Sequence, residues 1–370
     1  MNGPAPAPAP APARSAPTLS DEQARAYMLK LLTAMSQANG SDLFIAHDFP
    51  PSMKVQGAMT PLTSQKLTGE IAAQLARATM NERQREEFER EMECNFAIAI
   101  PGLSRFRVNV FMQQGHVGMV LRTIAAEIPN FEKLRLPEVL KDVVMNKRGL
   151  VLVVGGTGSG KSTTLAAMID HINKTEYGHI LSVEDPIEFV HTAQKCLINQ
   201  REVHRDTHGF NEALRSALRE DPDIILVGEM RDIETIRLAL TAAETGHLVF
   251  ATLHTSSAAK TIDRIIDVFP AGEKPMVRSM LSESLRAVIS QALLKRVGGG
   301  RTAAWEIMVG TPAIRNLIRE DKVAQMYSSI QTGQQYGMMT LDQHLQDLVK
   351  RSMVTKQQAR DYAKDKRLFD

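Results

Sequence analysis

The sequence predicts an α/β protein built around a phosphate-binding loop, and three observations support that prediction. An apolar run at residues 150–154 leads into a glycine-rich loop, and a helical pattern follows from Lys161. Further apolar runs at 179–183, 223–227 and 247–253 alternate with helical stretches. Each run is followed by a carboxylate or a histidine. Such alternation is typical of a mainly parallel sheet with helices on both faces.

The glycine-rich loop matches the pattern G-x-x-x-x-G-K-[ST], with Gly155 as its first position. Its glycines let the backbone take positive φ and approach a ligand closely, so that N–H groups point at anionic oxygens. We expect Lys161 to reach the β- and γ-phosphates of ATP, and the Ser162 hydroxyl to lie on Mg²⁺. The predicted nucleotide-binding residues are Gly155, Gly156, Thr157, Gly158, Ser159, Gly160, Lys161, Ser162 and Thr163.

The composition is that of an ordinary globular protein, and it argues against several function classes. The 370 residues, 43% of them apolar, suffice for two domains. Cys94 and Cys196 are too few for a disulfide framework or a four-cysteine zinc site, which fits a reducing compartment. A net charge of +2 and 5% aromatic residues argue against a nucleic-acid partner. No apolar run approaches the roughly 18 residues that a membrane span requires.

Shifts in pattern along the chain predict its division. Residues 1–19 are a proline- and alanine-rich tail, expected to be a disordered spacer. Residues 20–122 combine a helix that begins at Ser20 or Asp21 with short alternating strands, which predicts an α+β domain. Residues 123–136 are a plausible linker, and 137–270 form the core around the glycine loop. Residues 271–370 are expected to be helical, with one helix over 276–294.

Three residues at predicted strand ends are the candidates for chemistry beside the loop. Glu184 follows the run at 179–183, and open α/β sheets bind ligands at the carboxyl ends of their strands. Glu229 follows four apolar residues, as in a Walker B motif, and would hold Mg²⁺ through water or orient the attacking water. His254 ends the next strand and is a candidate sensor of the γ-phosphate. The simpler alternatives are a turn cap for Glu184 and a structural role for His254.

Arg105, Arg107 and Arg122 lie on two consecutive predicted strands of the N-terminal domain. Residues two apart on a strand face the same side, so Arg105 and Arg107 could project from one surface. A solvated strand face is the simpler interpretation. Phosphoryl transfer, however, commonly needs an arginine from outside the core domain to neutralise charge.

Five motifs, in this order, resemble those of the secretion-type hexameric ATPases over about residues 21–369. The glycine loop resembles their Walker A motif. Residues 183–188, 228–232 and 251–255 resemble the Asp box, the Walker B motif and the His box. Residues 313–320, Ala-Ile-Arg-Asn-Leu-Ile-Arg-Glu, resemble the signature of the PilT retraction subfamily.

The N-terminal domain resembles the paralogous PilU group more closely. Residues 41–45, 50–55 and 117–122 are PilU-like, and Gly156 stands where PilT proteins commonly have proline. The second half of the chain is much more similar to PilT. The chain is therefore identified as a member of the PilT/PilU group, closer to PilT, with the choice between primary motor and accessory subunit open.

The resemblance implies a RecA-like core, preceded by a PAS-like α+β domain and followed by C-terminal helices. It implies a cytoplasmic homohexamer, peripheral to the inner membrane, that uses ATP and Mg²⁺ to depolymerise type IV pili in twitching motility. Implied partners are an inner-membrane platform protein similar to PilC and a paralogous PilT/PilU ATPase. Arg107 and Arg122 match the nucleotide-sensing arginines of the family. One of Glu184 and Glu229 would activate the attacking water and the other would position the metal, and the sequence does not say which does which.

Three other functions remain open from the sequence. A nucleic-acid motor would need a basic channel with stacking aromatic residues. A catalytically idle subunit would bind nucleotide without turnover, although Lys161, Glu184, Glu229 and His254 are all present. A pilus-assembly or type II secretion ATPase would drive extension, and the sequence does not give the direction of force.

Overall fold

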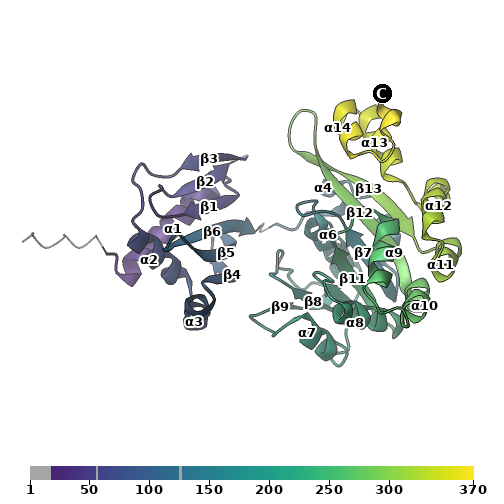
Figure 1. Cartoon of the computed structure of the whole chain (residues 1–370), viewed down its shortest axis with the longest axis horizontal. Helices are drawn as coiled ribbons and strands as arrows, with labels where there is room; N and C mark the ends of the chain where they lie inside the picture. Colours follow the sequence, from purple (N-terminus) through teal and green to yellow (C-terminus); the bar gives the residue numbers. More distant parts are fainter. Residues whose placement is uncertain (1–17, 56, 125–126) are drawn as a thin grey trace, which may run out of the picture. The chain divides into compact units, whose positions relative to one another are not determined.

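The computed structural model describes residues 18–370 except 56, 125 and 126, so most of the predicted proline- and alanine-rich tail lies outside the described residues. The chain divides into two compact units, residues 1–126 and 127–370 (Figure 1). Each unit has its own sheet and its own hydrophobic core. The finer division into a linker, a core and a C-terminal region stays a prediction.

The first unit is an α+β domain, as predicted. Helix α1 (Asp21–Gln37) begins at Ser20, whose hydroxyl accepts a hydrogen bond from the N–H of Gln23 in a capping box. Helices α1 and α2 (Gly69–Thr79) share a core with the sheet, whereas α3 (Glu82–Glu91) buries no residue. The sheet is antiparallel, in the order β3-β2-β1-β6-β5-β4. Its strands are β1 (Asp42–Ile45), β2 (Ser52–Val55), β3 (Ala58–Pro61), β4 (Glu93–Ile100), β5 (Ser104–Gln113) and β6 (His116–Ile124).

The second unit contains the glycine loop and a mainly parallel sheet, in the order β13-β12-β7-β11-β10-β8-β9. Among the strands described here, the pairing of β12 with β13 is antiparallel and the others in this sheet are parallel. The strand that leads into the loop, β7, lies beside β11, and β10 and β8 follow in the sheet order. The four strands predicted to carry functional residues are therefore neighbours. The strands are β7 (Gly149–Val154), β8 (Gly178–Glu184), β9 (Cys196–Glu202), β10 (Ile224–Val227), β11 (Leu248–Leu253), β12 (Leu285–Lys295) and β13 (Arg301–Val309).

Helices cover both faces of this sheet. Successive residues of β7 point to opposite faces, so Leu150 and Leu152 join one buried cluster and Val151 and Val153 join another. The first cluster includes residues of α7 to α10, and the second includes residues of α5 and α6. The helices are α4 (Phe131–Leu134), α5 (Val139–Val144), α6 (Lys161–Thr175), α7 (Phe210–Ala217), α8 (Ile233–Glu244), α9 (Ala258–Asp267), α10 (Lys274–Ser284), α11 (Pro312–Arg319), α12 (Met326–Thr332), α13 (Leu341–Lys350) and α14 (Lys356–Tyr362).

The helix predicted over residues 276–294 is wrong beyond Ser284. Helix α10 ends there, and the chain continues as β12, which pairs with β7 on one side and β13 on the other. The region predicted to be helical thus contributes two strands to the sheet. A short apolar run with the residues Ala287, Val288 and Ile289 fits a buried strand as well as a buried helix face, so periodicity alone does not separate the two.

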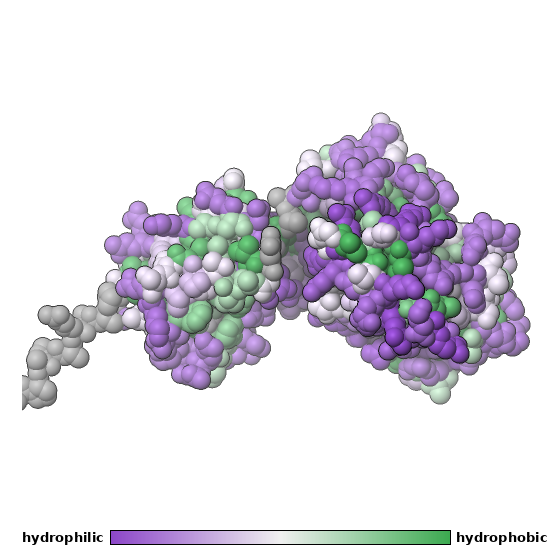
Figure 2. Space-filling model, turned by 90° about the horizontal axis from the view of Figure 1, so that it is seen from above, coloured by the Kyte–Doolittle hydropathy of each residue, from purple (hydrophilic) through white to green (hydrophobic). Residues whose placement is uncertain are grey.

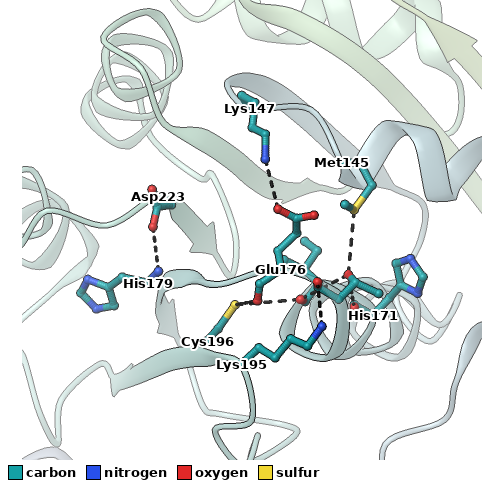
Figure 3. Close-up of polar contacts among 10 residues, drawn as sticks. Met145, Lys147, His171, Glu176, His179, Lys195, Cys196 and Asp223 are labelled. Carbon is teal, nitrogen blue, oxygen red and sulfur yellow. Dashed lines mark hydrogen bonds and ion pairs between the residues drawn. The ribbon is translucent and has the colours of Figure 1, made fainter.

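Polar contacts tie the elements together at the end of the sheet where β8 and β9 begin (Figure 3). The Sγ of Cys196 donates to the carbonyl of Glu176 at 3.2 Å, and the N–H of His179 donates to Oδ2 of Asp223 at 2.8 Å. Burial raises the pKa of the Cys196 thiol. Both cysteines are buried and free.

Hydrophilic residues predominate on the face of the second unit that Figure 2 shows. Large exposed apolar side chains are spread over both units, among them Phe49, Met92, Leu197 and Val297. Among the described residues, no helix combines the length and the apolar character that crossing a membrane requires.

Candidate active site

The glycine loop has the predicted positive φ at three of its four glycines, but not at Gly156. Gly155, Gly158 and Gly160 have positive φ values of 150°, 73° and 90°, and α6 begins directly after the loop at Lys161. A Cβ on Gly155 would lie 2.3 Å from the carbonyl oxygen of Gln291, so only glycine fits there. A Cβ on Gly156 would meet no atom within 4 Å. The loop therefore needs glycine at Gly155 for both space and conformation, but not at Gly156.

The side chain of Lys161 lies over the loop. Its Nζ donates to the carbonyl oxygens of Gly155 at 2.9 Å and Gly156 at 3.2 Å. Burial lowers the pKa of Lys161, and the carboxylates of Glu229 and Glu188 oppose that shift. Backbone N–H groups of the loop, the N-terminus of α6 and this ammonium group together form a site for a polyphosphate.

Polar side chains surround the start of α6. Ser162 and Thr163 are half-buried in its first turn, and Thr157 is exposed in the loop. Ser159 is buried, and its hydroxyl has no hydrogen-bond partner among the described residues. Hydroxyl and carboxylate oxygens, completed by substrate phosphates, are the ligands that Mg²⁺ prefers. Ser162 and Glu229 supply such oxygens and fit that ion, although the described residues hold no preformed cluster of three or more histidine, cysteine or carboxylate ligands.

Gln291 was not predicted as a site residue, yet it holds the loop in place. Its Nε2 donates to the carbonyl oxygen of Ser159 at 2.7 Å, and its Oε1 accepts from the hydroxyl of Thr164 at 2.8 Å. Gln291 and Thr164 are both buried. One amide on β12 thus connects the glycine loop to the first turns of α6.

Glu184 is the last residue of β8, as expected for a strand-end carboxylate. Its Oε1 accepts from the hydroxyl of Ser182 at 2.7 Å and from Nε2 of Gln200 at 3.2 Å. Burial raises the pKa of Glu184, while these two hydrogen bonds and one from the N–H of Glu188 act in the opposite direction. Glu184 lines a pocket with Ser162 and Thr252, so it lies close to the first turn of α6.

Glu229 and His254 meet at the same edge of the sheet. Oε1 of Glu229, two residues after β10, lies 3.1 Å from Nε2 of His254, the first residue after β11. Oε2 of Glu229 accepts from Nε of Arg231 at 2.8 Å. The hydroxyl of Thr252 donates to the carbonyl oxygen of Gly228 at 2.5 Å, which fixes the backbone next to Glu229. Arg231 and Thr252 lie within the Walker B-like and His-box-like segments, but neither was predicted as a site residue.

Arg107 and Arg122 belong to the first unit and lie opposite each other in the pairing of β5 with β6. Nε of Arg122 donates to Oδ1 of Asp42 at 2.8 Å, and the arginine side chain is largely exposed. Arg105 lies two residues before Arg107 on β5, so the two share a face of the strand. The glycine loop and the strand-end residues belong to the second unit, and a role for these arginines at the nucleotide stays a prediction.

The chain is similar to known proteins over most of its length. The family model described as "Type II/IV secretion system protein" matches residues 95–369. The type IV pilus retraction ATPase PilT of Pseudomonas aeruginosa is 61% identical over 335 residues, which cover 90% of this chain and 97% of PilT. The type IV pilus ATPase PilU of the same organism is 46% identical over 344 residues, covering 92% of this chain and 90% of PilU.

Solved structures agree with these similarities. The crystal structure of a pilus retraction motor PilT with bound ADP superimposes with a TM-score of 0.86 at 46% identity, and covers 92% of this chain and 97% of its own. The structure of the ATPase DotB of Legionella pneumophila follows with a TM-score of 0.77 at 27% identity, covering 90% and 94%. The identity to PilT is greater than the identity to PilU, in agreement with the assignment of the chain closer to PilT.

Proposed function

This chain belongs to the type II/IV secretion system protein family, within which it is a PilT-type retraction ATPase, and we propose how its residues carry out that activity. It binds and hydrolyses ATP, and its function is type IV pilus retraction in twitching motility. One observation supports the proposed mechanism above all. Neighbouring parallel strands deliver the glycine loop, Glu184, and the pair of Glu229 and His254 to one edge of a single sheet.

The loop binds the triphosphate. Its N–H groups and the N-terminus of α6 face the phosphate oxygens, and Lys161 exchanges its contacts with two loop carbonyls for contacts with the β- and γ-phosphates. Ser162, together with Glu229 directly or through water, would hold Mg²⁺, which neutralises charge on the phosphates. Gln291 keeps the loop in the conformation that binds.

Glu184 is the better candidate for the base that activates the attacking water. Burial raises its pKa, and a carboxylate whose pKa is closer to the working pH accepts a proton more effectively. Glu229 is already paired with Arg231 and His254. This arrangement fits a carboxylate that positions the metal ion and connects it, through His254, to the γ-phosphate. In this assignment His254 contacts the γ-phosphate and Glu229 together, and so senses hydrolysis.

Arg107 and Arg122 act on the nucleotide from the N-terminal unit. Their guanidinium groups would neutralise phosphate charge when that unit closes over ATP, and hydrolysis would release them. Asp42, which pairs with Arg122 at 2.8 Å, would hold that arginine in position between closures. The helix α11, which carries Ala313 to Arg319, would transmit the resulting motion.

The active form is a homohexamer, as family membership implies. We place it in the cytoplasm, at the inner membrane, where a platform protein similar to PilC would receive the force. A paralogous PilT/PilU ATPase is a second partner, and nucleic acid is not expected to be one, because the net charge is only +2.

The test is steady-state ATPase activity of the purified chain with Mg²⁺, beside K161A, with the mass of each sample measured by light scattering after size exclusion. K147A, which removes an ammonium group with an 86% exposed side chain, is the matched control. The wild type and K147A are expected to turn over as hexamers. K161A is expected to form hexamers with kcat lowered at least about 100-fold, because the charge that stabilises the transition state is gone.

Other outcomes would change the assignment. Hexamers of the wild type that show no turnover would identify an accessory subunit that depends on a paralogous motor. Strong, salt-sensitive stimulation by DNA would instead identify a nucleic-acid motor. A deletion strain with too few pili would indicate assembly, whereas retraction predicts too many.

A further inference from the structure

The side chain of Gln200 on β9 uses both ends of its amide. Its Nε2 donates to Oε1 of Glu184 at 3.2 Å and to the carbonyl oxygen of Phe189 at 2.8 Å. Its Oε1 accepts from the N–H of His191 at 2.8 Å. One residue therefore joins the loop that follows β8 to β9, and directs an N–H at the carboxylate of Glu184.

Ser182 provides the second donor to the same oxygen. It lies two residues before Glu184 on β8, so the two side chains share a face of the strand. Ser182 is only 4% exposed, and its hydroxyl donates to Oε1 of Glu184 at 2.7 Å. Both donors contact Oε1, which fixes the position of that oxygen, and the N–H of Glu188 donates to the same carboxylate.

These residues line one pocket with the start of the nucleotide-binding helix. Ser182, Glu184 and Gln200 share it with Ser162, in the first turn of α6, and with Thr252 of β11. The hydrogen bonds to Glu184 therefore lie next to the phosphate-binding loop rather than in a remote part of the core.

We infer that Ser182 and Gln200 are positioning residues, which orient the carboxylate of Glu184 for the attacking water by holding its Oε1 between them. The inference rests on the proposed function, in which Glu184 accepts the proton of that water. A hydroxyl and an amide N–H stabilise the ionised carboxylate more than the neutral acid, so they also extend the pH range in which Glu184 works as a base. No motif of the sequence singles out either residue.

Other charged groups near Glu184 are unchanged in the variants that test this inference. Glu188 follows on the same loop, and its charge raises the pKa of Glu184. His191 lines the pocket, Glu202 is the register partner of Glu184 on β9, and Glu229 follows the neighbouring strand β10. A difference in pH profile between the wild type and S182A or Q200L thus reports the loss of one donor.

The experiment measures kcat and the KM for ATP between pH 5 and about 9 for the wild-type hexamer, S182A, Q200L, Q200E and E184Q. Asn199, exposed on the same strand, supplies the control N199A. S182A and Q200L are each expected to move the acid limb of kcat up by about one pH unit, the value of a hydrogen bond to a charged group. Their KM is expected to stay within about twofold of the wild type, because ground-state binding is untouched.

Q200E makes the test sharper. It keeps an oxygen for the N–H of His191, but replaces the donor to Glu184 with a second carboxylate. Like charges disfavour ionisation, so the acid limb is expected to move further than in Q200L. If Gln200 had only a structural role, the shift of the acid limb would not be larger in Q200E than in Q200L. If Q200L does not fold, as judged by circular dichroism and its hexamer mass, S182A and Q200E still test the positioning role.

The outcomes separate this inference from the proposed function. The positioning role would be overturned if S182A and Q200E kept the kcat of the wild type and its dependence on pH at the acid side, while E184Q was inactive. Glu184 would then still be the base. Full activity of E184Q would overturn the inference, while the ATPase activity stands. Absence of turnover in the wild type would refute the proposed function and this inference with it.

Discussion

Oε1 of Glu229 lies 3.1 Å from Nε2 of His254, so the residues that follow two neighbouring strands meet in one polar contact. Removing the imidazole takes away this contact and leaves the ion pair of Glu229 with Arg231. We expect H254A to lower kcat about 10- to 100-fold, as is usual when the partner of a metal-orienting residue is lost. The affinity for ADP, measured with a fluorescent analogue, is expected to change little. H208A, at an exposed histidine before α7, is the control, and equal kcat values for the two variants would contradict the role of His254.

The two adjacent glycines Gly155 and Gly156 are expected to differ sharply in their tolerance of a side chain. Gly155 has a φ of 150° and no room for a Cβ, whereas Gly156 has neither constraint. G155A is expected to lose about 1–3 kcal/mol of stability to backbone strain and to lose ATP binding with it. G156A is expected to keep kcat and KM within about twofold, because a Cβ there would lie more than 4 Å from the described atoms around it. Thermal unfolding with and without ATP measures the stability and nucleotide binding of each variant, and steady-state kinetics measures kcat and KM. If G155A and G156A lost stability and activity to the same extent, the two glycines would not differ as the loop geometry predicts.

Sequence patterns predicted much of this site because its main residues sit at the ends of parallel strands. Once the runs before Glu184, Glu229 and His254 are recognised as strands of one sheet, their ends must lie at a common edge beside the loop. The same reasoning does not predict Gln291 as a site residue. Its contact with Ser159 joins residues 132 positions apart, and it depends on a strand whose apolar sequence also fits a helix.

Other parts of the site depend on contacts that no local pattern encodes. Ser182 and Gln200 are ordinary polar residues on strands. Ser182 shares a face of β8 with Glu184, whereas only the pairing of β8 with β9 brings Gln200 to that carboxylate. The pairing of Arg107 with Arg122 follows from antiparallel neighbours in the N-terminal sheet. Their proposed role at the nucleotide follows from no spacing or periodicity, because they and the glycine loop belong to different units.

Gln291 is expected to be essential for the glycine loop rather than for the chemistry. Q291L leaves the carbonyl oxygen of Ser159 and the hydroxyl of Thr164 without their buried partner, at a cost of about 1–3 kcal/mol. We expect a lower melting temperature and a raised KM for ATP, with a smaller effect on kcat at saturating ATP. Differential scanning fluorimetry over an ATP titration measures this. Q331L, at an exposed glutamine, is the control, and wild-type values for Q291L would show that the loop holds its shape without the amide.

The stability of the second unit is expected to fall between pH 6.5 and pH 4 because of His344. Its Nδ1 accepts from the N–H of Trp305 at 2.9 Å, and burial lowers its pKa from 6.5 to about 4. The unfolded chain therefore binds a proton as the pH falls through 6.5, whereas the folded chain stays neutral until about pH 4. Over that window the free energy of unfolding should fall by up to about 3 kcal/mol. The single tryptophan of the chain, Trp305, reports the transition in urea. H344N keeps an acceptor for the N–H of Trp305 but does not titrate, so its curve should be flatter by that amount, and parallel curves for the two proteins would show that His344 does not carry the effect.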